Sequence, residues 1–325
     1  MERNLAGEAG QHVLRVQQKT WEADGITSVT LVDPSGKPLP TWKPGAHVAL
    51  HLPNGLVREY SLCSDPQDST QWTVAVLRTP DSRGGSAYVH EGLPVGAHIP
   101  VDGPRNAFHL EEGPKHFLVA GGIGITPIIA MARELQAHGA DWSLLYTGRS
   151  RQTMAFLPEV QRLPRERVHV HIDEENGCYP DFKALLHSQD PRTLVYCCGP
   201  TAMMDAVADG MEDPSRLRLE RFKAPERELP PGQADEAFEV VINSTGERIP
   251  VGPDETVLAA LESAGVPVLS SCTEGICGTC ETGVISGDVD HRDFLLSPEE
   301  HEQAGTMMVC VSRCRGRGRE LILDL

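Results

Sequence analysis

The residues best suited to chemistry are three cysteines in the last third of the chain, Cys272, Cys277 and Cys280. Their C-x4-C-x2-C spacing is that of the loop that holds a plant-type [2Fe–2S] cluster, with a fourth thiolate supplied later in the chain. Such a loop must wrap the cluster so that backbone N–H groups point at its anionic sulfurs. Gly275 and Gly278 fit this requirement, because glycine tolerates unusual dihedral angles and a close approach.

The fourth ligand has two candidates, Cys310 and Cys314. Residues 307–311 form an apolar run that predicts a short buried strand containing Cys310. Four residues of strand span roughly 13 Å, so both thiols cannot reach one iron if the strand continues. Cys314 precedes residues 315–319, an arginine- and glycine-containing stretch that predicts an exposed turn. We therefore expect Cys310 to be the ligand and Cys314 to be a bystander thiol.

Two other interpretations of these cysteines are weaker. A thioredoxin-like dithiol at Cys277 and Cys280 should follow a βαβ strand and does not need Cys272. A structural zinc site usually pairs two C-x2-C knuckles, and only one such knuckle is present. The spacing thus favours an iron–sulfur cluster.

The composition limits the class of protein. A chain of 325 residues with 40% hydrophobic and 23% charged residues is long enough for two or three globular domains. The net charge of −17 argues against nucleic-acid binding and favours steering toward a basic partner. Nine cysteines without an apolar leader or a membrane-length apolar run predict a reducing, cytoplasmic setting and no membrane partner.

Residues 11–105 predict a small antiparallel β-barrel, because short apolar or alternating runs are separated by turn residues. The expected strands are residues 13–16, 26–32, 48–52, 57–62, 72–77 and 99–101.

Two motifs within this region could bind a ligand. Residues 58–62 place Arg58 and Tyr60 on one strand face and Ser61 on the other, although alone this is typical of an exposed edge strand. Residues 83–86, Arg-Gly-Gly-Ser, open a short helix with free N–H groups and a hydroxyl, which suits a single phosphate. Glycine pairs are also common in ordinary turns.

The pattern changes after residue 115 to alternating strands and helices, which predicts an open parallel α/β sheet. The apolar run 117–120 leads into the glycine-rich turn 121–125, and a helical pattern follows. Thr126 suits the N-cap of that helix and Pro127 its first position. This geometry receives a pyrophosphate, although it is not the G-x-G-x-x-G fingerprint.

Further expected strands, residues 143–147, 168–172 and 194–198, end at polar or small residues where ligands bind in such sheets. Cys198 is a candidate for a nicotinamide pocket, although a buried strand thiol is the ordinary interpretation. Arg149 and Arg151 follow a strand without a nearby carboxylate in the sequence, which leaves the choice between NADH and NADPH open.

The charged, proline-containing residues 223–236 predict a linker. Beyond it, a hairpin, a helix over 257–262, the cysteine loop and a closing strand over 321–323 predict an α+β ferredoxin (β-grasp) domain. The expected division is therefore a barrel domain at 1–109, a nucleotide-binding domain at 110–222, a linker at 223–236 and a ferredoxin domain at 237–325.

Taken together, these blocks resemble the phthalate dioxygenase reductase family, including vanillate demethylase-type reductases, over nearly the whole chain. The resemblance implies FMN, NADH as substrate and a [2Fe–2S] cluster. The residues that it assigns to FMN are Arg58, Tyr60, Ser61, Ala75, Val76, Leu77, Gly84, Gly85, Ser86, Thr126 and Phe222. The residues that it assigns to NADH are Gly122, Gly124, Arg149 and Cys198, and the cluster ligands are Cys272, Cys277, Cys280 and Cys310.

By the same resemblance, the protein is a cytoplasmic, monomeric reductase that passes electrons from NADH to a Rieske-type terminal oxygenase of aromatic catabolism. A reductase built of the same modules could instead serve a cytochrome P450 or another acceptor. A binding-class alternative is an electron-carrier ferredoxin fused to a non-catalytic barrel. Bound flavin and its bleaching by NADH would separate that carrier from both enzymes.

Overall fold

The structure is a computed structural model that describes residues 10–80, 84–225, 235–296, 298–315 and 320–325. The chain forms two compact units, residues 1–220 and 221–325, which are described separately. Most of the expected linker, and Arg83 of the glycine motif, lie outside the described residues. Among the helices in the described ranges, none is long and apolar enough to cross a membrane.

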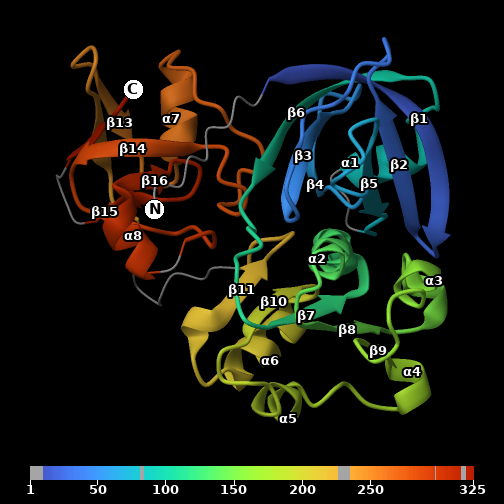
Figure 1. Ribbon diagram of the computed structural model, residues 1–325. Coiled ribbons are helices and arrows are strands. Elements are labelled where there is room, and N and C mark those ends of the chain that lie inside the picture. Colours follow the sequence, from blue (N-terminus) through green and yellow to red (C-terminus); the bar gives the residue numbers. More distant parts are fainter. Residues whose placement is uncertain (1–9, 81–83, 226–234, 297, 316–319) are drawn as a thin grey trace. The chain divides into compact units, whose positions relative to one another are not determined.

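The first unit begins with a six-stranded antiparallel sheet in the order β4-β3-β6-β1-β2-β5 (Figure 1). A bridge between Leu62 and Val74 joins the two edges, so the sheet curls on itself and the expected antiparallel fold is confirmed. Its interior is apolar, and Val16, Leu31 and Val48 are fully buried. The strands are β1 (Gln11–Ala23), β2 (Ile26–Val32), β3 (Ala46–His51), β4 (Val57–Ser61), β5 (Trp72–Leu77) and β6 (His98–Asn106), and helix α1 spans Gly85–Glu91.

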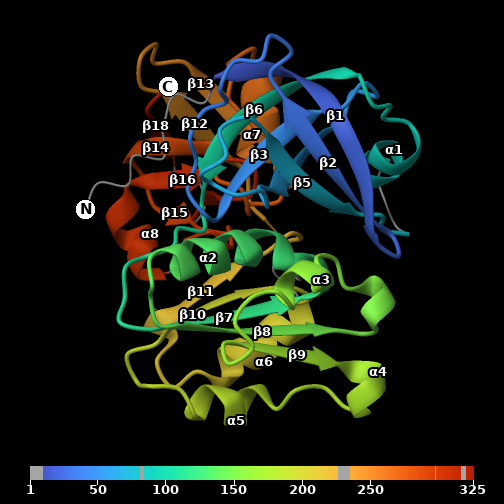
Figure 2. The same cartoon turned by 45° about the vertical axis from the view of Figure 1, so that its right-hand side comes forward.

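A five-stranded parallel sheet follows, in the order β11-β10-β7-β8-β9. Helix α2 (Ile125–Ala137) covers the face toward the curled sheet, and α5 (Phe182–His187) and α6 (Thr201–Gly210) cover the other face (Figure 2). The strands are β7 (His116–Gly121), β8 (Trp142–Gly148), β9 (Val168–Ile172), β10 (Leu194–Cys198) and β11 (Leu217–Glu220). Short helices α3 (Leu157–Val160) and α4 (Asp173–Asn176) and the 3-10 turns η1 (Gly122–Gly124), η2 (Arg151–Thr153) and η3 (Pro214–Arg216) complete the unit.

Strand β11 was not expected from the sequence. It is short, lies at the edge of the sheet and alternates leucine with charged residues, so it lacks the continuous apolar run of a central parallel strand. Its pairing with β10 places Glu220 beside Cys198.

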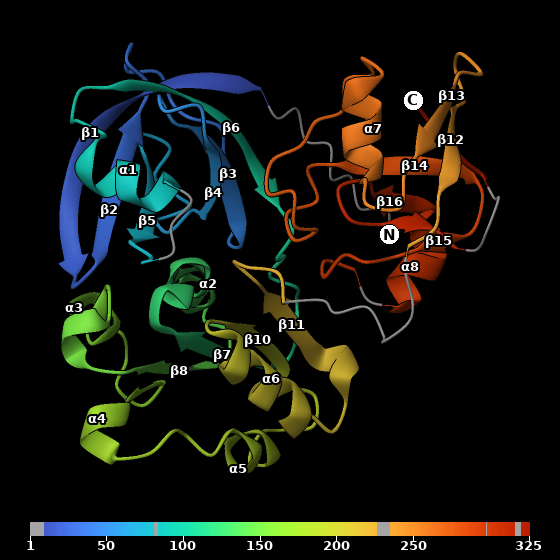
Figure 3. The ribbon, with the colours of Figure 1, turned by 180° about the vertical axis from the view of Figure 1, so that it is seen from behind.

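The second unit contains a five-stranded mixed sheet in the order β13-β12-β18-β14-β16 and a two-stranded ribbon, β15-β17 (Figure 3). Helix α7 (Val257–Ser263) is capped by Thr256, whose side chain accepts from the backbone N–H of Ala259. The cysteine loop lies between α7 and β14, as the expected ferredoxin domain requires. The other elements are β12 (Phe238–Ile242), β13 (Arg248–Val251), β14 (Glu281–Ser286), β15 (Val289–Asp290), α8 (Pro298–Ala304), β16 (Thr306–Met308), β17 (Arg313–Cys314) and β18 (Glu320–Leu323).

Candidate cofactor sites

The structure brings Arg58 to the glycine motif. Gly84 has φ 93° and Gly85 begins α1, so the chain turns sharply next to the Arg58 side chain. A Cβ added to Gly85 would lie 2.6 Å from Nε of Arg58, so any larger residue would require the Arg58 side chain to move. A guanidinium, the Ser86 hydroxyl and a helix start then form a cradle whose donors suit a phosphate.

Strand β4 divides its side chains between two environments. Tyr60 packs against the core of the curled sheet, and this burial raises the pKa of its hydroxyl to about 12. Ser61 is buried on the other face, where its hydroxyl donates to Glu220 at 3.2 Å. Glu59 shares the face of Ser61 and lies 3.8 Å from Nε2 of His47.

Strand β5 holds the other residues expected along the flavin. Ala75 is buried against the hydrophobic cluster that includes α2, and Leu77 is partly exposed. Val76 points into the core of the curled sheet, and its carbonyl accepts a hydrogen bond from His90 at 2.8 Å. Ala75 and Leu77 therefore face away from the core of the curled sheet, whereas Val76 faces into it.

The glycine-rich turn after β7 differs from the expected helix start. Helix α2 begins at Ile125, after the 3-10 turn η1, and its N-cap is Gly124. Thr126 is therefore not the N-cap, and its hydroxyl donates to the carbonyl of Ile123 at 3.1 Å. The expectation was wrong because the tight glycine turn continues directly into the helix and leaves no extended residue for a side-chain cap. Gly122 has φ 53°, a conformation that favours glycine.

The predicted nucleotide residues Gly124 and Cys198 are in contact. A Cβ added to Gly124 would lie 2.1 Å from the Cys198 carbonyl oxygen, so only glycine allows this approach. Cys198 is fully buried, and burial, followed by nearby Glu220, raises the pKa of its thiol well above the usual value. The thiol is thus neutral at physiological pH and can pack against an uncharged ring but is not a nucleophile.

A carboxylate that is distant in the sequence lies beside Arg151, because the helix after the neighbouring strand β9 supplies it. Glu175 in α4 forms two hydrogen bonds with Arg151, at 2.6 and 2.8 Å. The backbone N–H of Glu174 donates to the Arg149 carbonyl at 3.1 Å, which holds α4 against the loop after β8. The apparent lack of a carboxylate near these arginines was therefore wrong, because parallel strands bring distant loops together at one sheet edge.

Sequence reasoning missed Glu220, which lies at the carboxyl end of β11. Burial, followed by the charge of Glu59, raises the pKa of Glu220 to about 8. A carboxyl that is neutral at pH 7 beside Ser61 and Cys198 has the properties of a functional group. Residues 217–220, Leu-Arg-Leu-Glu, alternate apolar and charged side chains before Phe222. The acidic residue at the end of this pattern is the signal that could have identified Glu220.

The four expected cluster cysteines converge in the second unit. Cys272 interacts with the thiols of Cys277 and Cys310, and Cys280 interacts with Cys310. These contacts lower the pKa of Cys272 and Cys280, and the same neighbours together with burial raise the pKa of Cys310. Three sulfurs from the loop and that of Cys310 thus lie together, and an iron–sulfur cluster would supply the positive charge that four thiolates require.

The loop backbone suits an anionic group. The N–H of Glu274 points at the Cys272 sulfur at 3.3 Å, and the N–H of Thr279 points at the Cys277 sulfur at 3.5 Å. Gly275 adopts φ 71°, and Thr273 shares this region with φ 57°. Such N–H groups directed at sulfur are the hydrogen bonds that tune a cluster.

The path of the chain to Cys310 differs from the expectation. Strand β16 ends at Met308, and a turn follows in which the N–H groups of Val311 and Ser312 donate to the Met308 carbonyl. The predicted strand through residue 311 was therefore wrong, although Cys310 does lie with the other thiols. Cys314 lies in β17, paired with Val289 of β15. The turn, rather than strand length, separates the two cysteines.

Phe222 belongs to the second unit and is 44% exposed. Its expected position on the flavin therefore stays a prediction.

Two family models match parts of the chain. Residues 240–315 match the 2Fe-2S iron-sulfur cluster binding domain, and residues 118–209 match the oxidoreductase NAD-binding domain. The chain is 43% identical to the putative toluene-4-sulfonate monooxygenase system reductase subunit TsaB2 of Comamonas testosteroni. That alignment covers 93% of this chain and 95% of the relative.

Two solved structures match nearly the whole chain. Phthalate dioxygenase reductase, described as a modular structure for electron transfer from pyridine nucleotides to [2Fe–2S], is 36% identical with a TM-score of 0.70. That match covers 97% of this chain and 98% of the other. An intact type IV self-sufficient cytochrome P450 monooxygenase is 42% identical with a TM-score of 0.89, and the match covers 97% of this chain but 41% of that one.

Proposed function

The chain belongs to the phthalate dioxygenase reductase family, and from this membership we propose that it passes electrons from NADH, through FMN and a [2Fe–2S] cluster, to a Rieske-type terminal oxygenase. The oxygenase would hydroxylate or O-demethylate an aromatic substrate. The observation that carries the proposal is that one chain combines an arginine packed on a glycine pair, a glycine-rich strand-to-helix turn at Gly124 and four convergent thiols.

When bound, the cofactors would supply the chemistry, which is the conversion of a two-electron hydride donor into a source of single electrons. The protein positions these groups and sets their surroundings, so no nucleophile is required. The neutral thiol of Cys198 and the neutral carboxyl of Glu220 fit this role, because neither places a negative charge where the hydride arrives.

We assign the FMN phosphate to Arg58 and residues 84–86, whose donors form the cradle. Tyr60 and Ser61 would contact the ring and ribityl chain. Ala75, Val76 and Leu77 would line the flavin, with Val76 contributing its backbone. Thr126 and Phe222 would lie beside the ring. All of these residues except Thr126 and Phe222 belong to the proposed FMN domain, 1–109, and those two belong to the proposed domain 110–222.

We assign NADH to the proposed domain 110–222. Gly122 and Gly124 would approach the pyrophosphate, Arg149 would contact the pyrophosphate or adenosine, and Cys198 would pack on the nicotinamide. The ion pair between Arg151 and Glu175 supports NADH over NADPH, because the arginine that could accept a 2′-phosphate is already engaged.

The cluster would be held by Cys272, Cys277, Cys280 and Cys310 in the proposed ferredoxin domain 237–325. The N–H groups of Glu274 and Thr279 already point at two of these sulfurs. We further propose that the protein is a cytoplasmic monomer whose acidic surface steers it to a basic patch on the oxygenase.

A cytochrome P450 is the second candidate acceptor. The observation that favours it is the high TM-score against a self-sufficient P450, in which a region similar to this chain is joined to further protein. The oxygenase remains the primary proposal because TsaB2, of which the alignment covers 95%, is named as a reductase subunit of a monooxygenase system.

The test is electron delivery by the purified protein to each acceptor under anaerobic conditions. A Rieske-type oxygenase should lose its oxidised visible spectrum rapidly on addition of NADH and catalytic amounts of the reductase. A P450 should be reduced much more slowly, and a Cys310→Ser variant should reduce neither. Preferential reduction of the P450 would replace the proposed acceptor with the second candidate.

A further inference from the structure

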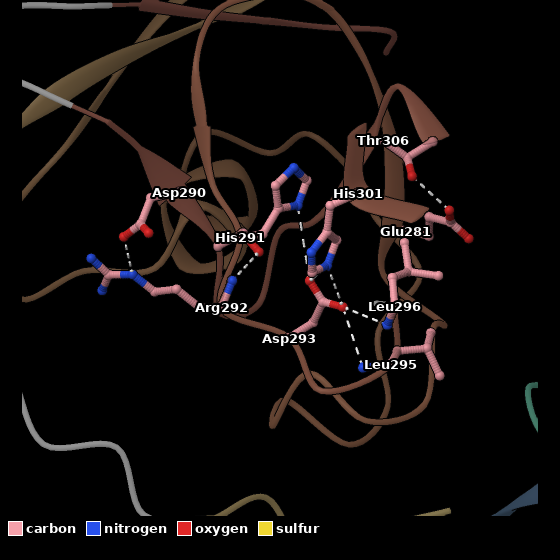
Figure 4. Close-up of polar contacts among 10 residues, drawn as sticks. Glu281, Asp290, His291, Arg292, Asp293, Leu295, Leu296, His301 and Thr306 are labelled. Carbon is pink, nitrogen blue, oxygen red and sulfur yellow. Dashed lines mark hydrogen bonds and ion pairs between the residues drawn. The ribbon is translucent and has the colours of Figure 1, made fainter. Parts of the chain in front are cut away.

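A second group of metal-ligating side chains lies in the ferredoxin unit, apart from the four cysteines. His291, Asp293 and His301 each offer one ligand atom, and these atoms lie within 4.8 Å of one another. His291 and Asp293 follow β15, and His301 lies on α8 (Figure 4). The proposed function uses none of the three.

Asp293 is held in position by the backbone. Its side chain is 1% exposed, and one carboxylate oxygen accepts the N–H groups of Leu295 and Leu296 at 3.3 and 3.1 Å. The other oxygen lies 3.0 Å from Nε2 of His301 and 4.0 Å from Nδ1 of His291, and Nε2 of His301 also lies 3.1 Å from the first oxygen. Hydrogen bonds that fix one carboxylate oxygen and leave the other directed at a site are typical around protein-bound metals.

His291 has an unsatisfied nitrogen within the group. Its Nδ1 is buried without a hydrogen-bond partner among the described residues. An unpaired buried nitrogen is unfavourable, because it has lost its hydrogen bonds to water without gaining a replacement.

We propose that His291, Asp293 and His301 bind one divalent cation of the zinc class. Two imidazole nitrogens and one carboxylate oxygen suit zinc, and three protein ligands leave a fourth position for water. A cation would give the unpaired nitrogen of His291 a partner and would neutralise the buried carboxylate of Asp293.

Binding requires a local rearrangement. The two imidazole rings are stacked, with centroids 4.1 Å apart and an interplanar angle of 14°. Zinc lies in the plane of each coordinating ring, at about 2.0–2.1 Å from nitrogen. The rings must therefore turn out of the stack, while Asp293 stays fixed by its backbone donors.

The site lies against the cysteine loop without sharing its ligands. A Cβ added to Gly275 would lie 3.1 Å from Cα of Asp293, and the N–H of Phe294 donates to the Gly275 carbonyl at 3.0 Å. A cation would connect α8, through His301, to the segment that contains Asp293 and Phe294 and packs on the cysteine loop. Its role would be to hold that segment against the loop.

The experiment uses the full-length protein with its cofactors, cleared of loosely bound metal by a chelator and then dialysed. Zinc chloride is titrated by calorimetry, and zinc and iron are counted after gel filtration. We expect one zinc to bind per chain while the iron content is unchanged. His291→Asn and His301→Gln retain amide groups near the lost nitrogens but are poor zinc ligands, so each should weaken binding by at least about tenfold.

The matched control is His138→Gln, which removes a histidine that is 68% exposed in the other unit and should leave zinc binding unchanged. Zinc bound equally well by both site variants would overturn the proposal, as would the absence of stoichiometric binding by the unaltered protein. Iron content measured in every sample distinguishes loss of this site from damage to the cluster.

Discussion

Ser61 donates a hydrogen bond to Glu220 at 3.2 Å, although the two residues are 159 positions apart in the sequence. The contact joins the end of β4 in the curled sheet to the end of β11 in the parallel sheet. It therefore places a titratable carboxyl at the junction of the residues assigned to FMN and to NADH.

The first prediction concerns the pH dependence of hydride transfer. The pKa of Glu220 is raised to about 8, so the carboxyl is neutral below that pH and anionic above it. An anion near the flavin opposes the arriving negative charge, so the rate of flavin bleaching by NADH should fall above pH 8 by on the order of tenfold. Stopped-flow absorbance from pH 6 to 10 measures this rate. Glu220→Gln should abolish the decline, and a decline that persists in this variant would exclude Glu220 as its cause.

The second prediction concerns flavin retention. The alanine methyl in Gly85→Ala would lie 2.6 Å from Nε of Arg58 and displace the guanidinium from the phosphate cradle. A charge-assisted hydrogen bond contributes roughly 1.5–3 kcal/mol, so FMN affinity should fall about 10- to 100-fold. Flavin fluorescence during dialysis provides the measurement.

Gly92→Ala is the matched control for this experiment, because its methyl would crowd Tyr88 at 2.8 Å at the other end of α1. It should keep FMN. Equal loss of flavin from both variants would indicate damage to the helix rather than to the cradle, and extraction of FAD from the unaltered protein would refute the cofactor assignment.

The third prediction separates the two C-terminal cysteines. Cys310→Ser should lose the cluster, because Cys310 interacts with Cys272 and Cys280, whereas Cys314→Ser should retain about two irons per chain. Electron paramagnetic resonance of each reduced variant checks this. A normal [2Fe–2S] signal from Cys310→Ser would transfer the role to another thiol.

The sequence was sufficient for features encoded by neighbouring residues. The Cys272–Cys280 spacing, the strand-turn-helix at 117–135 and the glycine pair at 84–85 each depend on local order. The corresponding elements lie where they were expected, except that α2 begins at Ile125 instead of after an N-cap at Thr126. The predicted strand over 307–311 continued beyond the end of β16, because no glycine or proline marks the turn after Met308.

The remaining features depend on pairing between distant segments. Glu220 meets Ser61 only because β11 joins the edge of the parallel sheet, and Glu175 meets Arg151 only because β9 lies beside β8. The proximity of His291 and His301 likewise requires α8 to fold back on the segment after β15. The local pattern of apolar residues does not predict which residues of distant strands and helices lie side by side.

The fourth prediction concerns nucleotide choice. The Arg151 guanidinium holds the pKa of Glu175 below its usual value, so the pair is charged and the arginine is engaged at neutral pH. The unaltered protein should prefer NADH. Glu175→Gln should free Arg151 for a 2′-phosphate and raise kcat/KM for NADPH severalfold, with little change for NADH.

Steady-state kinetics with both nucleotides measures the effect, and the double variant Arg151→Ala, Glu175→Gln should remove the gain. A higher kcat/KM for NADPH in the unaltered protein would contradict the assignment.

The last prediction is that the ferredoxin unit is the exit for electrons. Every residue assigned to FMN and NADH, except Phe222, lies in the compact unit 1–220, so hydride transfer should not need the cluster. A fragment of residues 1–233, which retains Phe222, should fold, bind FMN and reduce ferricyanide with NADH. It should fail to drive the oxygenase, because the thiols that hold the one-electron carrier are all in the second unit.

The full-length protein is the reference, and Cys310→Ser is the matched control because it removes the cluster without shortening the chain. Both altered proteins should oxidise NADH with ferricyanide at rates close to the reference and should leave the oxygenase oxidised. If the 1–233 fragment drives the oxygenase at the full-length rate, electrons leave directly from the flavin and the proposed path through the cluster is wrong.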